Sequence, residues 1–428
     1  MNPLPASLDD HRVHARHPAG VLIGRVRYSP AKSLWFSGMA LAALIGGALT
    51  FSWAALGVYL GATATVLLLG HSLGSHRKLI HDSFSCPKWL EYLLVYLGVQ
   101  VGLDGPIGLL RQHELRDYAQ RLPDCHPYLR HGRGFWRDGW WQLHCELELA
   151  EPPAIGIEAR IADDRFYRFL ERTWRLQQLP PALLLYALGG WSFVVWGTCA
   201  RVATGVLGHW LIGHLAHNRG SAHYEVRAAA VQGRNVAFTS LLTMGECWHN
   251  NHHAFPGSAR LGLFAGEWDP GWWVLMLLRK AGLAADFRIP ERLPARPELV
   301  ALDGAGAGVL RAQALPTLHG RRIPTRLSAI AALCTAGPDE APGPRLVGPA
   351  AVIGRRAMRR LVGARTPFDE DGAAQRLTLS VGPTRLQGLP ALCVAFARRN
   401  ALCAAVGLAL APAAVAFENL RESLDAAG

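Results

Sequence analysis

Two long stretches without a charged residue limit the folds open to this chain. Residues 34–70 contain no Asp, Glu, Lys or Arg over 37 positions. A helix needs about 20 residues to cross a bilayer, so this stretch predicts two spans with a tight turn near residues 50–52. Residues 179–200 are again uncharged, and more apolar residues follow Arg201 up to His214. We expect a second hairpin there, with its turn near Arg201.

The charge distribution predicts how these hairpins are oriented. Half of the chain is hydrophobic and only 18% is charged, although the net charge is +12. Basic residues flank both ends of the first stretch: Arg25, Arg27, Lys32, Arg77 and Lys78. Lys and Arg are enriched in the cytoplasmic loops of membrane proteins, so both ends of the stretch are expected to face the cytoplasm. We therefore expect an all-α integral membrane protein of four transmembrane helices in two hairpins, with a histidine-rich cap facing the cytoplasm. No basic RNA-binding pattern is present, so we expect no nucleic-acid partner.

Composition divides the chain into three parts. Residues 1–33 are polar and predict a cytoplasmic segment, and residues 34–292 carry the apolar stretches. Residues 293–428 are rich in Ala, Gly, Pro and Arg, which predicts a loosely ordered extension. The eight cysteines form no CxxC pair, and this argues against a zinc ribbon or a disulfide framework.

Histidines gather where the predicted spans end. Fourteen of the 18 lie between residues 71 and 253. In the stretch 246–256, His249, His252 and His253 are spaced i, i+3 and i+4, which places three imidazoles on one face of a helix. Neutral imidazole is the commonest metal ligand. The spacing therefore predicts a metal site.

Two segments carry a family resemblance. Residues 74–84 read GSHRKLIHDSF and residues 248–256 read WHNNHHAFP. They resemble the first and last histidine boxes of membrane-bound acyl-CoA (stearoyl-type) desaturases, and the resemblance extends over about residues 34–273. It implies seven iron ligands: His76, His81, His113, His217, His249, His252 and His253.

Three positions depart from the family pattern. The middle box, His-x-x-His-His in the family, has Arg116 and Asp117 as its last two residues, and Gly213 stands where the family keeps Asn. The resemblance implies two irons, and these departures leave the binding of the second one open. Substitute ligands that we consider are Asp117, His71, His126 and His214.

His76 and His81 add a geometric constraint. They are five residues apart, which is about 140° around a regular α-helix. Either they serve different irons, or the helix unwinds at that point.

The resemblance implies oxygen-dependent desaturation of a fatty acyl chain. Removing hydrogen from an unactivated methylene exceeds side-chain acid–base chemistry, so a cofactor must supply it. The sequence contains no GxGxxG and no HPGG, so a separate electron donor is expected, either ferredoxin or a cytochrome with its reductase. The alternatives are a membrane hydroxylase or monooxygenase with similar metal chemistry, and a diverged protein that binds lipid or metal without turnover.

Overall fold

The first apolar stretch forms two consecutive long helices. The computed structural model describes residues 12–15, 18–314, 317–318 and 321–322. The two helices are Pro30–Leu49 and Trp53–Ile80, and the break between them falls at residues 50–52, as predicted, where the Ser52 hydroxyl caps the second helix by accepting from the N–H of Ala55. Their segments are α1 (Pro30–Leu41), η3 (Ala42–Gly46), α2 (Gly47–Leu49), α3 (Trp53–Thr65) and the π-helix η4 (Val66–Ile80).

The second stretch also folds as helix, but it bends at a different place from the one predicted. Its segments are η5 (Leu176–Gln178), α9 (Leu179–Val194), η6 (Val195–Ala200) and α10 (Arg201–Asn218). Gly189 and Gly190 leave helical geometry, and Gly190 has a φ of +62°, which favours glycine. A Cβ atom added at Gly197 would lie 2.6 Å from a methyl of Leu185, so the chain folds back on itself at this bend.

The predicted turn near Arg201 is therefore wrong. Arg201 lies inside the helix and is buried. Its guanidinium donates to the carbonyls of Gly197 and Gln100 and to the side chain of Gln178. A buried guanidinium is tolerated there because its donors meet acceptors.

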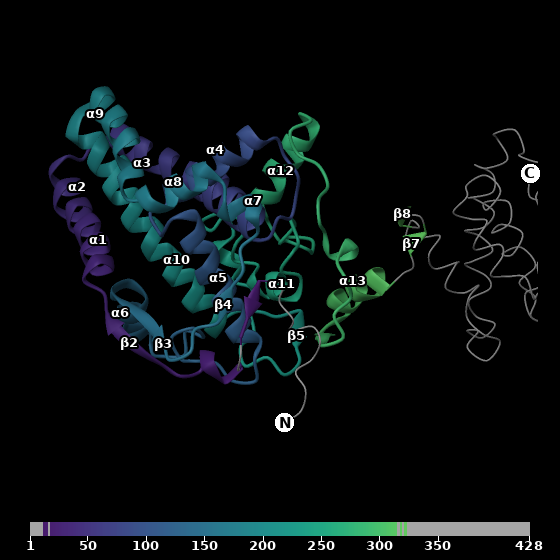
Figure 1. The fold of residues 1–428 in the computed structure, drawn as a ribbon. Helices are drawn as coiled ribbons and strands as arrows, with labels where there is room; N and C mark the ends of the chain where they lie inside the picture. The colour runs from purple at the N-terminus through teal and green to yellow at the C-terminus, as the bar shows by residue number, and fades with distance from the viewer. Residues whose placement is uncertain (1–11, 16–17, 315–316, 319–320, 323–428) are drawn as a thin grey trace, which may run out of the picture. The chain divides into compact units, whose positions relative to one another are not determined.

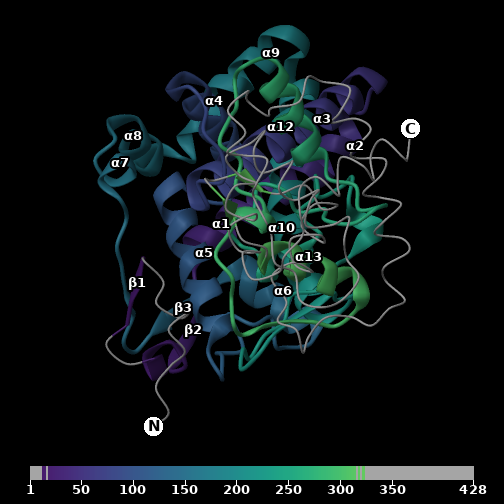
Figure 2. The ribbon, with the colours of Figure 1, turned by 90° about the vertical axis from the view of Figure 1, so that its right-hand side faces the viewer.

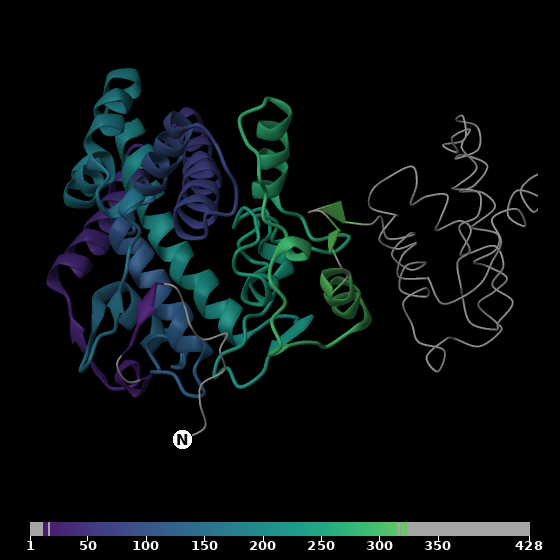
Figure 3. The ribbon, with the colours of Figure 1, turned by 45° about the vertical axis from the view of Figure 1, so that its right-hand side comes forward.

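The apolar helices turn large hydrophobic side chains outward. Leu34, Leu49 and Leu183 are 76%, 80% and 69% exposed. Within the described residues, three helices are long and apolar enough to cross a membrane. Figures 1 and 3 show α1, α3, α9 and α10 as neighbours on one side of this part of the molecule. Outward leucines along neighbouring helices are the surface expected of a protein surrounded by lipid.

The other helices pack beside and beneath these spans. Residues 89–110 hold nearly all of one helix, α4 (Lys88–Val99), and the start of the next. In close contact with η4, α4 leaves no room for a side chain at Gly70 or Gly74, where an added Cβ would lie 2.3 Å and 2.2 Å from α4 backbone atoms. The helices are α4 (Lys88–Val99), α5 (Pro106–Arg121), α6 (Phe135–His144), α7 (Ala159–Ala162), α8 (Arg165–Thr173), α11 (His249–Ala254), α12 (Pro270–Lys280) and α13 (Gly304–Ala314), with short 3-10 turns η2 (Pro18–Val21), η7 (Ala237–Thr239) and η8 (Pro290–Arg292).

The described residues are mostly helical, but the all-α prediction overlooked short antiparallel strand pairs. These are β1 (Val13–His14) with β4 (Ala154–Ile155), β2 (Gly24–Tyr28) with β3 (Cys145–Leu149), β5 (Tyr224–Val226) with β6 (Leu299–Ala301), and β7 (Thr317–Leu318) with β8 (Arg321–Arg322). Strands of two to five residues are too short for a clear alternating pattern. Figures 1 and 2 show β2 and β3 at the end opposite to α9. The first compact unit extends to Gln313, and residues 323–428 of the predicted extension lie outside the described residues.

Candidate metal centre

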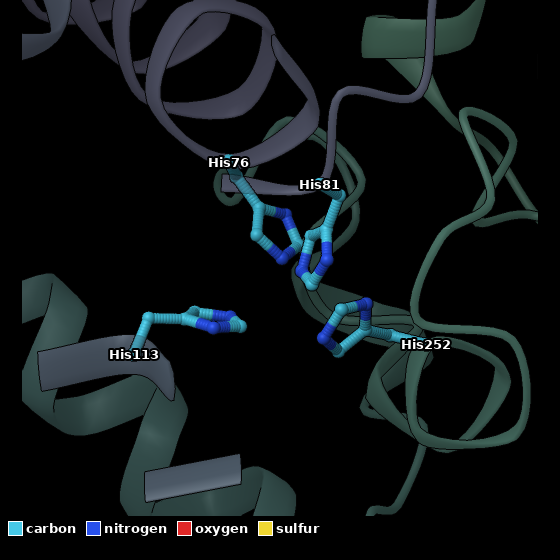
Figure 4. A group of neighbouring side chains, drawn as sticks. All are labelled: His76, His81, His113 and His252. Carbon is cyan, nitrogen blue, oxygen red and sulfur yellow. The ribbon is translucent and has the colours of Figure 1, made fainter. Parts of the chain in front are cut away.

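Four histidines from three helices converge on one point, and we call them the four-histidine group. They are His76 and His81 at the end of η4, His113 on α5 and His252 on α11, and one ring nitrogen of each lies within 4.8 Å of the others. Figure 4 shows the four rings directed toward a common centre. The ring centroids of His76 and His252 are 4.6 Å apart, and those of His81 and His113 are 4.9 Å apart.

The π-helix explains how His76 and His81 reach the same point. The N–H of His81 donates to the carbonyl of His76, five residues earlier, at 3.1 Å. This i→i+5 bond places residues five apart one above the other. We expected either that the two histidines serve different irons or that the helix unwinds. Instead, the helix stays wound and widens into a π-helix, so both side chains reach one point.

The four-histidine group has the donor chemistry that a metal requires. Burial holds the pKa of His81, His113 and His252 well below its usual value, with nearby imidazoles as a further cause, so these rings are neutral. Three buried ring nitrogens have no hydrogen-bond partner within the described part of the chain: Nδ1 and Nε2 of His252 and Nε2 of His81. Buried polar atoms without partners are costly, and a cation would satisfy them. The group fits a metal.

A second set of histidines, the three-histidine group, lies at the ends of α10 and α11. It consists of His217, His249 and His253, again within 4.8 Å of one another. The Nε2 atoms of His217 and His249 are 3.1 Å apart, and those of His249 and His253 are 3.0 Å apart. Burial is the main cause that holds the pKa of His249 well below its usual value and lowers that of His253 to about 3. Three neutral imidazoles with converging nitrogens also fit a metal.

The two asparagines between these histidines hold α11 in place. Asn250 accepts from the N–H groups of His223 and Tyr224, and its amide donates to the carbonyls of Tyr224 and Gly233. Asn251 donates to the carboxylate of Glu267 at 2.8 Å. A six-residue helix has little stability of its own, so these buried contacts orient the histidines. The sequence offered Asn beside His as a signal, but the role of the asparagines went unrecognised.

A buried carboxylate orients His76. Oε2 of Glu246 lies 2.6 Å from Nδ1 of His76, and the other oxygen accepts from Arg77 at 2.9 Å and from Ser72 at 2.7 Å. Burial would raise the pKa of Glu246, but His76 and Arg77 outweigh it and hold that pKa well below its usual value. An ionised carboxylate on Nδ1 turns the lone pair of Nε2 toward the metal position. Glu246, three residues before His249, was missed as a functional residue; an acidic residue in an apolar context was the signal.

The positions that depart from the family pattern are connected to one another. Nη1 of Arg116 is 2.7 Å from Nε2 of His131 and donates to the Leu129 carbonyl at 3.0 Å. A Cβ added at Gly213 would come within 3.1 Å of the same His131 nitrogen. The missing side chain at 213 thus makes room for the ring that holds Arg116. Asp117 lies 3.9 Å from Nδ1 of His113 and belongs to neither histidine group.

The three other substitute ligands lie outside both groups. Nδ1 of His214 is 2.9 Å from Asp138, whose same oxygen contacts Nδ1 of His131 and Nε1 of Trp210, both at 2.9 Å. Burial raises the pKa of Asp138, but His131 and the other donors lower it to about 2. This set forms a buried network of its own. His71 packs against His209 with ring centroids 5.3 Å apart, and Nδ1 of His126 accepts from the N–H of Tyr128.

A cavity of about 640 Å³ connects both groups with the apolar helices. His76 and His113 of one group and His217 and His249 of the other line it. Its volume lies within the range of about 300–1,000 Å³ typical of ligand pockets. The lining also includes large apolar side chains, among them Trp35, Phe36, Leu109, Trp174, Val206 and Trp210. An apolar ligand in this cavity would therefore lie beside both histidine groups.

Comparison with known proteins agrees with this geometry. The family model described as fatty acid desaturase matches residues 51–261. The chain is 37% identical to sn-1 stearoyl-lipid 9-desaturase of Anabaena variabilis over 264 residues, which cover 61% of this chain and 94% of that protein. It is 36% identical to sn-2 palmitoyl-lipid 9-desaturase of Nostoc over 55% of this chain and 81% of the relative. An acyl-CoA 5-desaturase of Anemone leveillei is 34% identical over 58% and 76%. This chain belongs to the fatty acid desaturase family of membrane oxidoreductases.

Proposed function

We propose that this enzyme introduces a double bond into a fatty acyl chain, with O₂ as co-substrate and two irons held by the two histidine groups. The convergence of His76, His81, His113 and His252 carries the proposal, together with the ring nitrogens of His252 and Nε2 of His81, which have no hydrogen-bond partner in the described structure. The names of the relatives add the substrate class: they act on stearoyl- and palmitoyl-lipid or on acyl-CoA. We extend that class, fatty acyl groups, to this chain.

The residues of the chain divide the work as follows. The four-histidine group would hold one iron and the three-histidine group the other, and bound iron would supply the O₂ activation that side chains lack. Glu246 fixes the tautomer of His76. The cavity would hold the acyl chain beside both groups and exclude water from the reacting carbons. Reducing O₂ to two waters takes four electrons, of which the acyl chain gives two and a separate ferredoxin or cytochrome with reductase gives two.

We place the enzyme in a bacterial inner membrane with its histidines toward the cytoplasm. Three candidate spans and the bend at Gly189–Gly190 support four spans in two hairpins. The basic residues around the first hairpin support the orientation. The membrane domain would comprise residues 34–292, with a cytoplasmic segment at 1–33 and an extension at 293–428.

Product analysis tests the proposal. Membranes that contain the enzyme, an acyl-lipid or acyl-CoA substrate and a reducing system are incubated under O₂, and the products are weighed by mass spectrometry. Loss of two hydrogens supports desaturation. Gain of one oxygen would instead make the chain a hydroxylase, and an unchanged substrate in membranes with intact iron would mark a protein without turnover.

A further inference from the structure

Gln120 points its amide oxygen at the three-histidine group. It lies on α5, seven residues and so two turns after His113, and only 1% of it is exposed. Its Nε2 donates to the Leu129 carbonyl at 2.8 Å, which fixes the orientation of the amide. Its Oε1 therefore faces Nε2 of His217, at 3.1 Å.

If the ring of His217 is neutral, its Nε2 cannot donate a hydrogen bond to Gln120. Nδ1 of His217 lies 2.7 Å from the Gly213 carbonyl, an acceptor, so this nitrogen carries the N–H. A neutral imidazole has only one N–H. Nε2 of His217 then presents a lone pair to Oε1 of Gln120, which is also an acceptor. Two acceptors at this distance repel one another unless a cation lies between them.

A proton on Nε2 of His217 would satisfy Gln120 alone, because this nitrogen faces two groups. Nε2 of His249 lies 3.1 Å from the same nitrogen, and Nε2 of His253 lies 3.0 Å from that of His249. A proton joins one donor to one acceptor, whereas a metal accepts lone pairs from several ligands at once. A metal that binds all of these lone pairs therefore removes the conflict.

We propose that Gln120 supplies its amide oxygen as the fourth protein ligand of the metal at His217, His249 and His253. It would take the place of the histidines that the family's middle box has at the positions of Arg116 and Asp117. Ligands at right angles around a metal about 2.1 Å away are separated by about 3 Å. The spacings in the structure are 3.1 Å from His217 to Gln120, 3.1 Å from His217 to His249 and 3.0 Å from His249 to His253.

Arg116 does not block this site, because its donors are engaged elsewhere. Nη1 of Arg116 hydrogen-bonds to the Leu129 carbonyl and to His131, and Nη2 donates to the side chain of Gln142 at 3.0 Å. An amide oxygen is a harder and weaker donor than imidazole. The two metals therefore differ: the one in the four-histidine group is held more firmly, and the one beside Gln120 leaves first.

The test is metal binding by the full-length protein in detergent, and it rests on the proposed two-iron function. Wild type, Gln120→Ala, Gln120→Glu and the control Gln112→Ala, an exposed glutamine on the same helix, are loaded with ⁵⁷Fe(II). Iron per chain and release to a chelator are then measured. Wild type and Gln112→Ala should hold two irons that are released in two phases. Gln120→Ala should lose one iron or release it at least about tenfold faster, while the slow phase stays unchanged and reports an intact fold.

The outcomes separate this inference from the proposed function. Two irons with unchanged release in Gln120→Ala would overturn the role of Gln120 alone, whereas a single iron in wild type would overturn the two-iron function as well. If Gln120→Ala does not fold, Gln120→Glu decides, because it keeps an oxygen ligand. One of its two Mössbauer doublets should shift, and a spectrum identical to that of wild type would contradict the proposal.

Discussion

The N–H of His81 donates to the carbonyl of His76 at 3.1 Å, across five residues and not the four of an α-helix. This single bond brings two histidines of one helix to the same point, where they meet His113 and His252. The widened turn is the local feature on which the four-histidine group depends.

Replacing a member of this group should abolish metal binding there. His252→Ala removes a buried ring whose two nitrogens lack any other partner in the described structure, so the iron of this group and the desaturase activity should both be lost. His126→Asn is the matched control, since an Asn oxygen can still accept from the Tyr128 N–H. Iron analysis should give about one iron in the first variant and about two in the second. Equal iron in the two variants would contradict the assignment.

Glu246→Gln should loosen the same metal without removing a ligand. The neutral amide no longer holds the N–H of His76 as firmly, and it leaves Arg77 with only Asp269 as an acidic partner. Iron affinity should fall about 10- to 100-fold, measured by competition with a chelator. Glu148→Gln, at an exposed ion pair with Arg27, should change nothing. An affinity in Glu246→Gln that matches wild type would refute the orienting role.

Asn250→Ala should destabilise α11 and its histidines. The substitution leaves the N–H groups of His223 and Tyr224 without their acceptor and removes two donated bonds. Unsatisfied buried groups cost about 1–3 kcal/mol each, so thermal unfolding of the metal-free protein should occur several degrees lower. Hydrogen exchange at residues 249–254 should also quicken. Unchanged exchange there would show that Asn250 is not a brace.

The metal-free protein should lose stability as the pH falls below about 6.5. Burial lowers the pKa of His81, His113, His249 and His252 in the folded state, whereas these residues take up protons normally once the chain unfolds. The unfolded state therefore binds more protons at acidic pH, and each histidine contributes about 1.4 kcal/mol of destabilisation per pH unit. Thermal unfolding at pH 7.5 and 5.5 measures the effect. A midpoint that does not change, or one that rises in acid, would mean that the histidines are not buried and neutral.

The sequence predicted the features that depend on composition and on local spacing. The uncharged run around residues 50–52 located the first helix break, and the box resemblance picked out the seven histidines that form the two groups. It misplaced the second bend, because Gly189–Gly190 breaks the helix while Arg201 finds buried acceptors that only the folded chain provides.

Some features that appear only in the folded chain were not predictable: one is local, and two are contacts between distant segments. The spacing of His76 and His81 does not reveal a π-helix, because residues five apart point in different directions on a regular α-helix. Gln120 reaches His217, 97 positions away, and the link between Arg116 and Gly213 runs through the ring of His131. Each of these two contacts requires the three-dimensional placement of at least two helices.

The binding of one iron by each histidine group is tested most directly by an anomalous-diffraction map, recorded at the iron edge from crystals of the iron-loaded protein. Two peaks are predicted, one among His76, His81, His113 and His252, and one among His217, His249, His253 and Gln120. A single peak, or peaks away from these side chains, would contradict it.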